Sequence, residues 1–226
     1  MAGAGDEPTR AADVDAAWVG RALQEAFPGC RVADVEVLDR NAGTTERARL
    51  RVTYREIGRG GLPPASLFVK LAPTDVRTRL FVDMMRLGRT EVRFYRDAAA
   101  DVPGELPRVY YATTTGRAQR FALLLEDLAA RGARFTNVSQ PLGGDEARMV
   151  MTRLARLHAA WWESPRLASD LAWLRSRERN PLYPVERFLC ALAVPSGVAA
   201  FRNLMPTPLH AAVPRIIAAR DALEDA

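Results

Sequence analysis

Hydrophobic and polar residues alternate along two segments in the first third of the chain. The first segment has apolar residues two positions apart, at Val35 and Val37. The second sets four apolar residues against four arginines: Ala48, Leu50, Val52 and Tyr54 alternate with Arg47, Arg49, Arg51 and Arg55. Such alternation is typical of a strand that buries one face. With the turn-forming residues 41–45 between them, the segments predict a β-hairpin that has one apolar and one charged face.

The same reading predicts two helices and three further strands before residue 129. The helices are a short one over residues 14–27 and a longer one over residues 78–98. The strands are 66–72, which Pro73 ends, and 108–114 and 120–125, which a polar turn containing Gly116 connects. The last strand runs directly into Glu126, Asp127 and Leu128.

Beyond residue 128 the chain changes character. Residues 129–145 form a glycine-rich connection, and helical segments separated by prolines follow. These are an amphipathic helix marked by Val150, Leu154, Leu157 and Trp161, shorter segments over 167–175, 185–192 and 195–204, and one after Pro208. The missing βαβ alternation argues against a parallel sheet. We therefore expect an α+β fold, in which residues 1–128 form a five-stranded antiparallel lobe with one helix inserted between its strands, and residues 129–226 form a partial helical lobe.

One acidic residue stands out in the helix predicted over residues 78–98. Its apolar face is formed by Leu80, Met84, Leu87, Phe94 and Tyr95, and Glu91 lies near the middle of that face. A carboxylate buried there without a partner would cost several kcal/mol, so Glu91 requires a cation. The strand just before this helix carries Lys70, the single lysine beside 31 arginines. A lysine is a compact point charge and an arginine a planar fork, which indicates a specific role for Lys70.

Composition excludes several classes of protein. The 226 residues are 48% hydrophobic and 26% charged, as in globular chains, and no apolar run approaches the ~20 residues that cross a bilayer. The amino terminus is acidic where a signal peptide would be basic, so we expect a cytoplasmic protein with no membrane partner. Two cysteines and two histidines make a zinc site improbable. The net charge of +5 is dispersed, which argues against a nucleic-acid surface.

The order of these features resembles the amino-terminal lobe of the protein-kinase-like fold. Six segments carry a closer resemblance: RNAGTTERARLRVTY, LPPASLFVKLAP, EVRFYRDAA, PRVYYA, FALLLEDL and LARLHAAWW. Over about residues 35–175 the sequence resembles the aminoglycoside phosphotransferase and choline kinase-like superfamily, particularly its ecdysteroid kinase-like members. The resemblance implies phosphorylation of a hydroxyl on a small molecule, with ATP and Mg²⁺ as cofactors. The acceptor and the oligomeric state are not indicated by any pattern.

The resemblance also assigns roles to individual residues. It implies that Lys70 contacts the α- and β-phosphates and that Glu91 is its partner. It places Gly43, Thr44 and Thr45 at the turn that covers the phosphates, although a single glycine is far short of G-x-G-x-x-G. Glu126 and Leu128 take the hinge positions, whose main-chain groups contact adenine.

The second half departs from the family pattern. An H-x-D-x-x-x-x-N-like catalytic loop is expected there, but His158 and His210 are each followed by two alanines. We therefore expect no catalytic residue and no metal ligand in this chain, and we interpret it as an inactive fragment that keeps the nucleotide-binding half. The alternative is a noncatalytic nucleotide-binding pseudokinase or partner-binding module. A basic nucleic-acid-binding domain is a second alternative, which the dispersed charge disfavours.

Structural roles compete with functional ones at several positions. The Lys70–Glu91 pair could be an ordinary salt bridge, and Asp127 could be a helix N-cap. We expect His158 to be a packed core histidine, and Trp161 and Trp162 to close a helical core. We expect the arginine face of the hairpin to be solvated.

Overall fold

The computed structural model describes residues 7–104, 106–115, 120–136, 140, 142–175 and 183–224. Gly116, in the predicted turn, lies outside the described residues. The chain divides into two compact units, residues 1–174 and residues 175–226, which are considered separately. The predicted lobe boundary at residue 128 stays a prediction.

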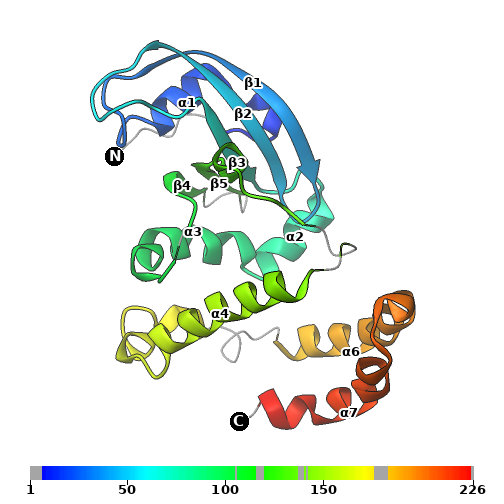
Figure 1. The fold of residues 1–226 in the computed structure, drawn as a ribbon. Coiled ribbons are helices and arrows are strands. Elements are labelled where there is room, and N and C mark those ends of the chain that lie inside the picture. The colour runs from blue at the N-terminus through cyan, green and yellow to red at the C-terminus, as the bar shows by residue number, and fades with distance from the viewer. Residues whose placement is uncertain are drawn as a thin grey trace. The chain divides into compact units, whose positions relative to one another are not determined.

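A five-stranded antiparallel sheet forms the first part of unit 1 (Figure 1). Its spatial order is β1-β2-β3-β5-β4. The strands are β1 (Arg31–Ala42), β2 (Glu46–Glu56), β3 (Ser66–Leu71), β4 (Val109–Thr115) and β5 (Arg120–Glu126). All five predicted strands are present, and the α+β class expected of a kinase-like amino-terminal lobe is confirmed.

The strand register separates the side chains onto two faces. Glu46 pairs with Leu71 and Arg47 with Lys70, so adjacent pairs point to opposite sides of the sheet. One face packs on the helix α1 (Ala16–Ala22), with Leu50, Val69 and Leu124 in its core. The other face carries Lys70 and Leu123. Each face therefore has its own apolar core, and the lysine lies on the face away from α1.

The helix predicted over residues 14–27 is shorter than expected. A 3-10 turn (Ala11–Asp13) precedes α1, whose N-cap Asp15 accepts the Trp18 N–H. After Ala22 the chain continues through turns to Phe27, which is buried against the same core. Burial of Phe27 and the turns before Pro28 take the place of the predicted last helical turns.

The single helix predicted over residues 78–98 is wrong. Two helices occupy this segment, α2 (Val76–Met84) and α3 (Leu87–Asp97). Between them Arg86 adopts a left-handed conformation with φ of +55°. The break turns the first half of the predicted apolar face toward solvent, since Leu80 is 58% and Leu87 is 45% exposed.

From residue 144 onward, the described part of unit 1 consists of one helix and short turns. It comprises α4 (Gly144–Trp161) and the 3-10 turns η4 (Pro165–Ala168) and η5 (Ala172–Arg175). The predicted helical core is wrong here, because Val150 and Leu154 are exposed on α4 and Trp162 is 75% exposed. His158 is also exposed and is not the packed core histidine we expected. The apolar side of α4 is open to solvent, so its side chains have no core to enter.

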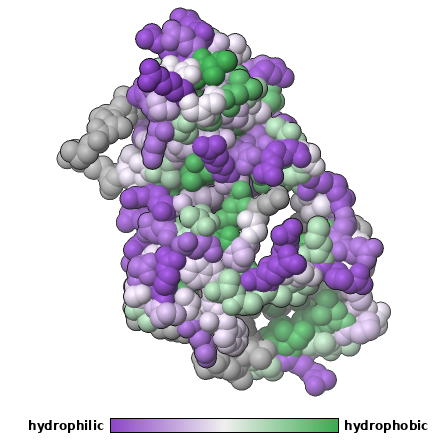
Figure 2. Space-filling model, turned by 60° about the vertical axis from the view of Figure 1, so that its left-hand side comes forward, coloured by the Kyte–Doolittle hydropathy of each residue, from purple (hydrophilic) through white to green (hydrophobic). Residues whose placement is uncertain are grey.

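Unit 2 contains α6 (Tyr183–Ala200), the turn η6 (Arg202–Leu204) and α7 (Thr207–Glu224). The two segments predicted over 185–192 and 195–204 are largely one helix, which continues through Pro195. A proline removes one helical hydrogen bond, yet its fixed φ is helical, so a sufficiently supported helix can contain it. Hydrophobic areas lie between hydrophilic ones on the face of the molecule shown in Figure 2. No described helix combines the length and the apolar character needed to cross a bilayer.

Candidate functional site

Lys70 and Glu91 meet on the face of the sheet away from α1. The Lys70 Nζ lies 2.7 Å from Oε1 and 2.6 Å from Oε2 of Glu91, so one ammonium holds both carboxylate oxygens. The two side chains are 21% and 29% exposed. The spatial contact that the sequence predicted is therefore present, and it is partly open to solvent.

Two elements hold this pair in place. Lys70 lies on β3, a central strand, between Arg47 on β2 and Leu123 on β5. Glu91 lies on α3, one turn after Gly88. A Cβ added to Gly88 would lie 2.1 Å from the ring of Phe121 on β5, so only glycine permits this close approach. The short distance between helix and sheet brings Glu91 within reach of the lysine.

The geometry leaves Lys70 able to bind an anion. An ammonium has three N–H donors, and Glu91 takes two of them. The third donor and the partial exposure of the side chain allow a further contact with a negatively charged oxygen. Tyr95 lines the same region, and burial, with a smaller contribution from the Glu91 charge, raises its pKa. A carboxylate that orients a lysine without covering it is suited to positioning that lysine on a ligand.

The predicted phosphate-covering turn joins β1 to β2. It lies at the end of the hairpin, two residues before Arg47, the cross-strand partner of Lys70. Gly43 donates its N–H to the Thr45 carbonyl at 3.1 Å. Thr45 is buried and Thr44 is exposed. The turn is thus near the lysine along the sheet, but the Gly43 N–H is already bonded within the turn.

The predicted hinge follows β5. The Glu126 N–H donates to the Arg108 carbonyl at 2.8 Å, and the Glu126 carboxylate accepts the Arg108 N–H at 3.1 Å. Leu128 starts the 3-10 turn η3 (Leu128–Arg131), and its carbonyl accepts the Ala133 N–H. The side chains of Glu126 and Leu128 are therefore half-buried parts of a well-bonded connection.

Asp127, between these two hinge residues, has more contacts than we predicted. Its Oδ1 accepts the Ala129 N–H at 3.0 Å, which confirms the predicted N-cap. Its Oδ2 accepts Nε of Arg49 at 3.1 Å and also the hydroxyl of Ser66. Burial raises the pKa of Asp127, but the hydrogen bonds from Ser66, Arg49 and Ala129 outweigh it and hold the pKa below its usual value.

The arginine face of the hairpin is only partly as we expected. Arg47, Arg51 and Arg55 are exposed, as predicted. Arg49 instead reaches the buried carboxylate of Asp127 and lies 3.4 Å from Asp39 on β1. Regular alternation of arginines contains no signal that separates this one from its neighbours.

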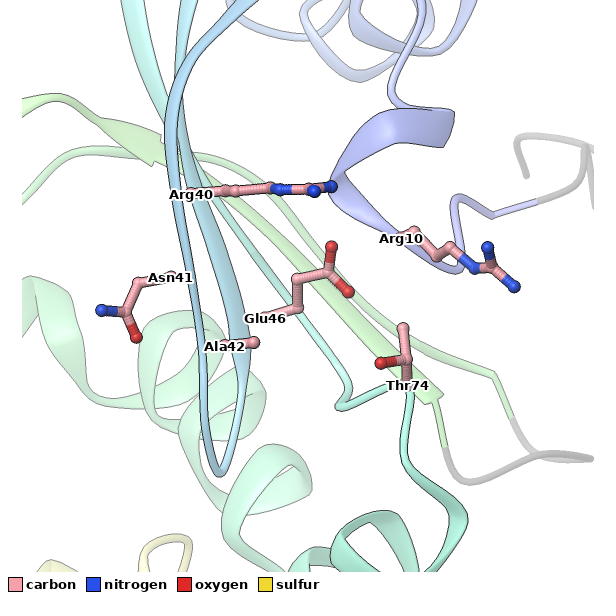
Figure 3. A pocket seen from close by; sticks show the side chains of 6 residues that line it. All are labelled: Arg10, Arg40, Asn41, Ala42, Glu46 and Thr74. Carbon is pink, nitrogen blue, oxygen red and sulfur yellow. The ribbon is translucent and has the colours of Figure 1, made fainter.

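A cavity of about 450 Å³ lies elsewhere, between the hairpin and the amino-terminal segment (Figure 3). It is lined by Arg10, Arg40, Asn41, Ala42, Glu46 and Thr74. Glu46 is buried, and its carboxylate accepts the Ala11 N–H at 2.7 Å. Because Glu46 and Arg47 point to opposite faces, this cavity is across the sheet from Lys70. Ala42 and Glu46, which line it, flank the predicted phosphate-covering turn, so the cavity lies beside that turn and away from the Lys70–Glu91 pair.

The described residues contain no group of three metal-ligating side chains that could hold an ion. Within the same residues, the predicted site has two parts. The Lys70–Glu91 pair and the turn after β1 are at one end of β3, and the Asp127 contacts are at the other end, beside Ser66.

Comparison with known proteins adds one finding. The sequence model of the ecdysteroid kinase-like family matches residues 44–163, just over half of the chain. The matched region includes Lys70, Glu91 and Asp127. No curated protein and no solved structure matched the chain. The chain belongs to the ecdysteroid kinase-like family, within the aminoglycoside phosphotransferase and choline kinase-like superfamily.

Proposed function

We propose that this protein binds ATP through Lys70, in the manner of a small-molecule kinase, with the lysine on the α- and β-phosphates. Membership of the family implies a small-molecule kinase-like function. The observation that carries the residue assignment is the two-oxygen contact of Glu91 with the Lys70 ammonium. Glu91 fixes the position of the charge, and the remaining donor is left for a phosphate oxygen.

The hinge and the turn complete the proposed nucleotide site. The Glu126 carbonyl and the Leu128 N–H are the main-chain groups that we assign to adenine. Gly43, Thr44 and Thr45 are assigned to the phosphates, which the position of their turn beside the Arg47–Lys70 register supports. Because the Gly43 N–H already donates to the Thr45 carbonyl, we assign to Gly43 the closing of the turn by this backbone bond, and not an N–H donated to phosphate.

Kinases of this kind use Mg²⁺, which when bound neutralises charge on the phosphates. The pair that we describe fits the phosphate part of such a ligand, since its ammonium is partly exposed and held by a carboxylate. We assign no metal ligand, because the described residues hold no suitable cluster. Lys70 contributes binding and orientation, and Glu91 holds Lys70.

Phosphoryl transfer itself needs a base to accept the hydroxyl proton. His158 and His210 are both followed by alanines and not by an H-x-D pattern. We therefore propose that the 226-residue chain binds nucleotide without turnover. This observation also favours the second candidate, a noncatalytic nucleotide-binding pseudokinase. For the first candidate, a small-molecule kinase, the group that accepts the phosphate is a hydroxyl of a small molecule.

Calorimetric titration with MgATP tests the proposal. We expect saturable binding by the wild-type chain and at least a tenfold weaker affinity in Lys70→Ala. Arg55→Ala is the matched control, because it removes an exposed positive charge from β2 without touching the site. Absence of wild-type binding, or equal affinity in Lys70→Ala, would contradict the proposal.

Turnover separates the two candidates. We expect no transfer of phosphate to a panel of amino alcohols, sugars and sterols by this chain. A reproducible rate that depends on Lys70 would show that the chain is an active kinase and that our assignment of inactivity is wrong.

A further inference from the structure

We infer that Asp127 is a positioning residue, which fixes the hinge backbone so that the site selects adenine over guanine. The inference rests on the proposed nucleotide function. It concerns a residue that lies between the two hinge positions, and that contacts three segments of the chain at once.

The contacts of Asp127 exceed what a helix cap requires. The bond from the Ala129 N–H alone caps η3. The other two donors, Arg49 and Ser66, come from β2 and β3 and are 78 and 61 residues distant in sequence. A carboxylate that is 3% exposed is costly unless its oxygens are satisfied, and here both are. The hinge is thereby joined to the sheet at the residue between Glu126 and Leu128.

Arg49 extends this connection to the hairpin. Its Nε binds Asp127, and its Nη1 lies 3.4 Å from Asp39 on β1. One guanidinium thus joins the hinge to both strands of the hairpin that carries the phosphate-covering turn. This cross-link restrains the hinge main chain relative to the rest of the proposed site.

The cross-link is remote from the phosphate lysine. Ser66 and Lys70 are four residues apart on β3, which is about 13 Å along an extended strand. A change at Asp127 should therefore affect recognition of the base and leave recognition of the phosphates largely intact. Adenine presents a donor where guanine presents an acceptor, so fixed main-chain groups can distinguish them.

The test compares the binding of MgATP and MgGTP to the full chain by calorimetry. We expect the wild type to prefer ATP. In Asp127→Asn, we expect ATP affinity to fall at least fivefold and GTP affinity to change less than twofold, which lowers the preference. Glu36→Gln is the matched control, since Glu36 is an exposed carboxylate that pairs with Arg51 on the hairpin. It should leave both affinities unchanged.

The outcomes separate this inference from the proposed function. If the wild type binds neither nucleotide, the proposed function fails. If the wild type binds both equally, or Asp127→Asn loses both equally, or the preference is unchanged, the positioning role is wrong while nucleotide binding stands. If circular dichroism shows that Asp127→Asn does not fold, Ser66→Ala serves as the second variant, because it removes one of the three contacts of Asp127. Ser66→Ala should then lower the preference for ATP over GTP at least twofold, and an unchanged preference contradicts the inference.

Discussion

Gly88 on α3 lies directly against the ring of Phe121 on β5. A Cβ at Gly88 would lie 2.1 Å from the Cδ1 of Phe121 and 2.4 Å from its Cε1. Phe121 is 4% exposed and packs in the core under α3, so its ring has little freedom to move. The distance between α3 and the sheet, and with it the reach of Glu91 to Lys70, depends on the absence of a side chain at this position.

Gly88→Ala should therefore destabilise the protein and weaken the Lys70–Glu91 contact. We expect the free energy of unfolding to fall by about 1–3 kcal/mol, as for an overpacked core. Urea denaturation followed by circular dichroism measures this change. The double variant Gly88→Ala/Phe121→Leu should lose less free energy of unfolding than the two single variants lose in sum, because the smaller leucine side chain leaves room for the added methyl group. An unchanged urea midpoint in Gly88→Ala would contradict the packing argument.

Gly43, in the turn that we propose covers the phosphates, provides the contrasting case. A Cβ at Gly43 would have no heavy atom within 4 Å, and its φ is not in the left-handed region. We expect Gly43→Ala to change the free energy of unfolding by less than about 0.5 kcal/mol. The same denaturation experiment measures it, with Gly88→Ala as the comparison. A loss as large as that of Gly88→Ala would show that the turn needs glycine for its backbone.

The stability of the protein should depend on the charge of Asp127. Burial raises the pKa of this carboxyl, but the bonds from Ser66, Arg49 and Ala129 lower it below its ordinary 3.8. A folded-state pKa below the unfolded value means that the carboxylate stabilises the fold above pH 3.8. That contribution is lost as the pH falls through the folded pKa.

Asp127→Asn should consequently reduce the free energy of unfolding at pH 7 by about 1–3 kcal/mol, the range for a buried charged hydrogen bond. The difference from the wild type should narrow below pH 3.8, where the wild-type carboxyl also loses its charge. Urea unfolding of both proteins at several pH values measures the gap. If the difference in free energy of unfolding between the two proteins is constant from pH 7 down to about pH 3, the charge of Asp127 does not contribute to stability.

Local sequence patterns predicted the sheet well for a physical reason. The alternation around Leu50 and Val52 reflects burial of every second residue, which the strand geometry itself imposes. The contact between Lys70 and Glu91 was predicted from the free-energy cost of burying an unpaired carboxylate, because Glu91 on an apolar helix face needs a cation as its partner. The contact at 2.6 Å bears this out.

The structural features that the sequence patterns did not predict depend on contacts between residues that are distant in the sequence. Arg49 and Asp127 are 78 residues apart, and nothing in the alternation of arginines marks the one that turns inward. The break at Arg86 falls inside a segment whose helical periodicity continues without a proline or glycine at that position. The apolar stripe of α4 predicted burial, but periodicity alone does not provide the partner that would cover Val150.

Our central claim is that Lys70 and Glu91 act as one unit in nucleotide binding, and a double-mutant cycle tests it most directly. Calorimetry would give the MgATP dissociation constants of the wild type, Lys70→Ala, Glu91→Gln and the double variant. If Glu91 acts only by holding Lys70, each single variant weakens binding and the double variant is no worse than Lys70→Ala, within about twofold. Fully additive losses, or a Lys70→Ala chain that binds as tightly as the wild type, would contradict the claim.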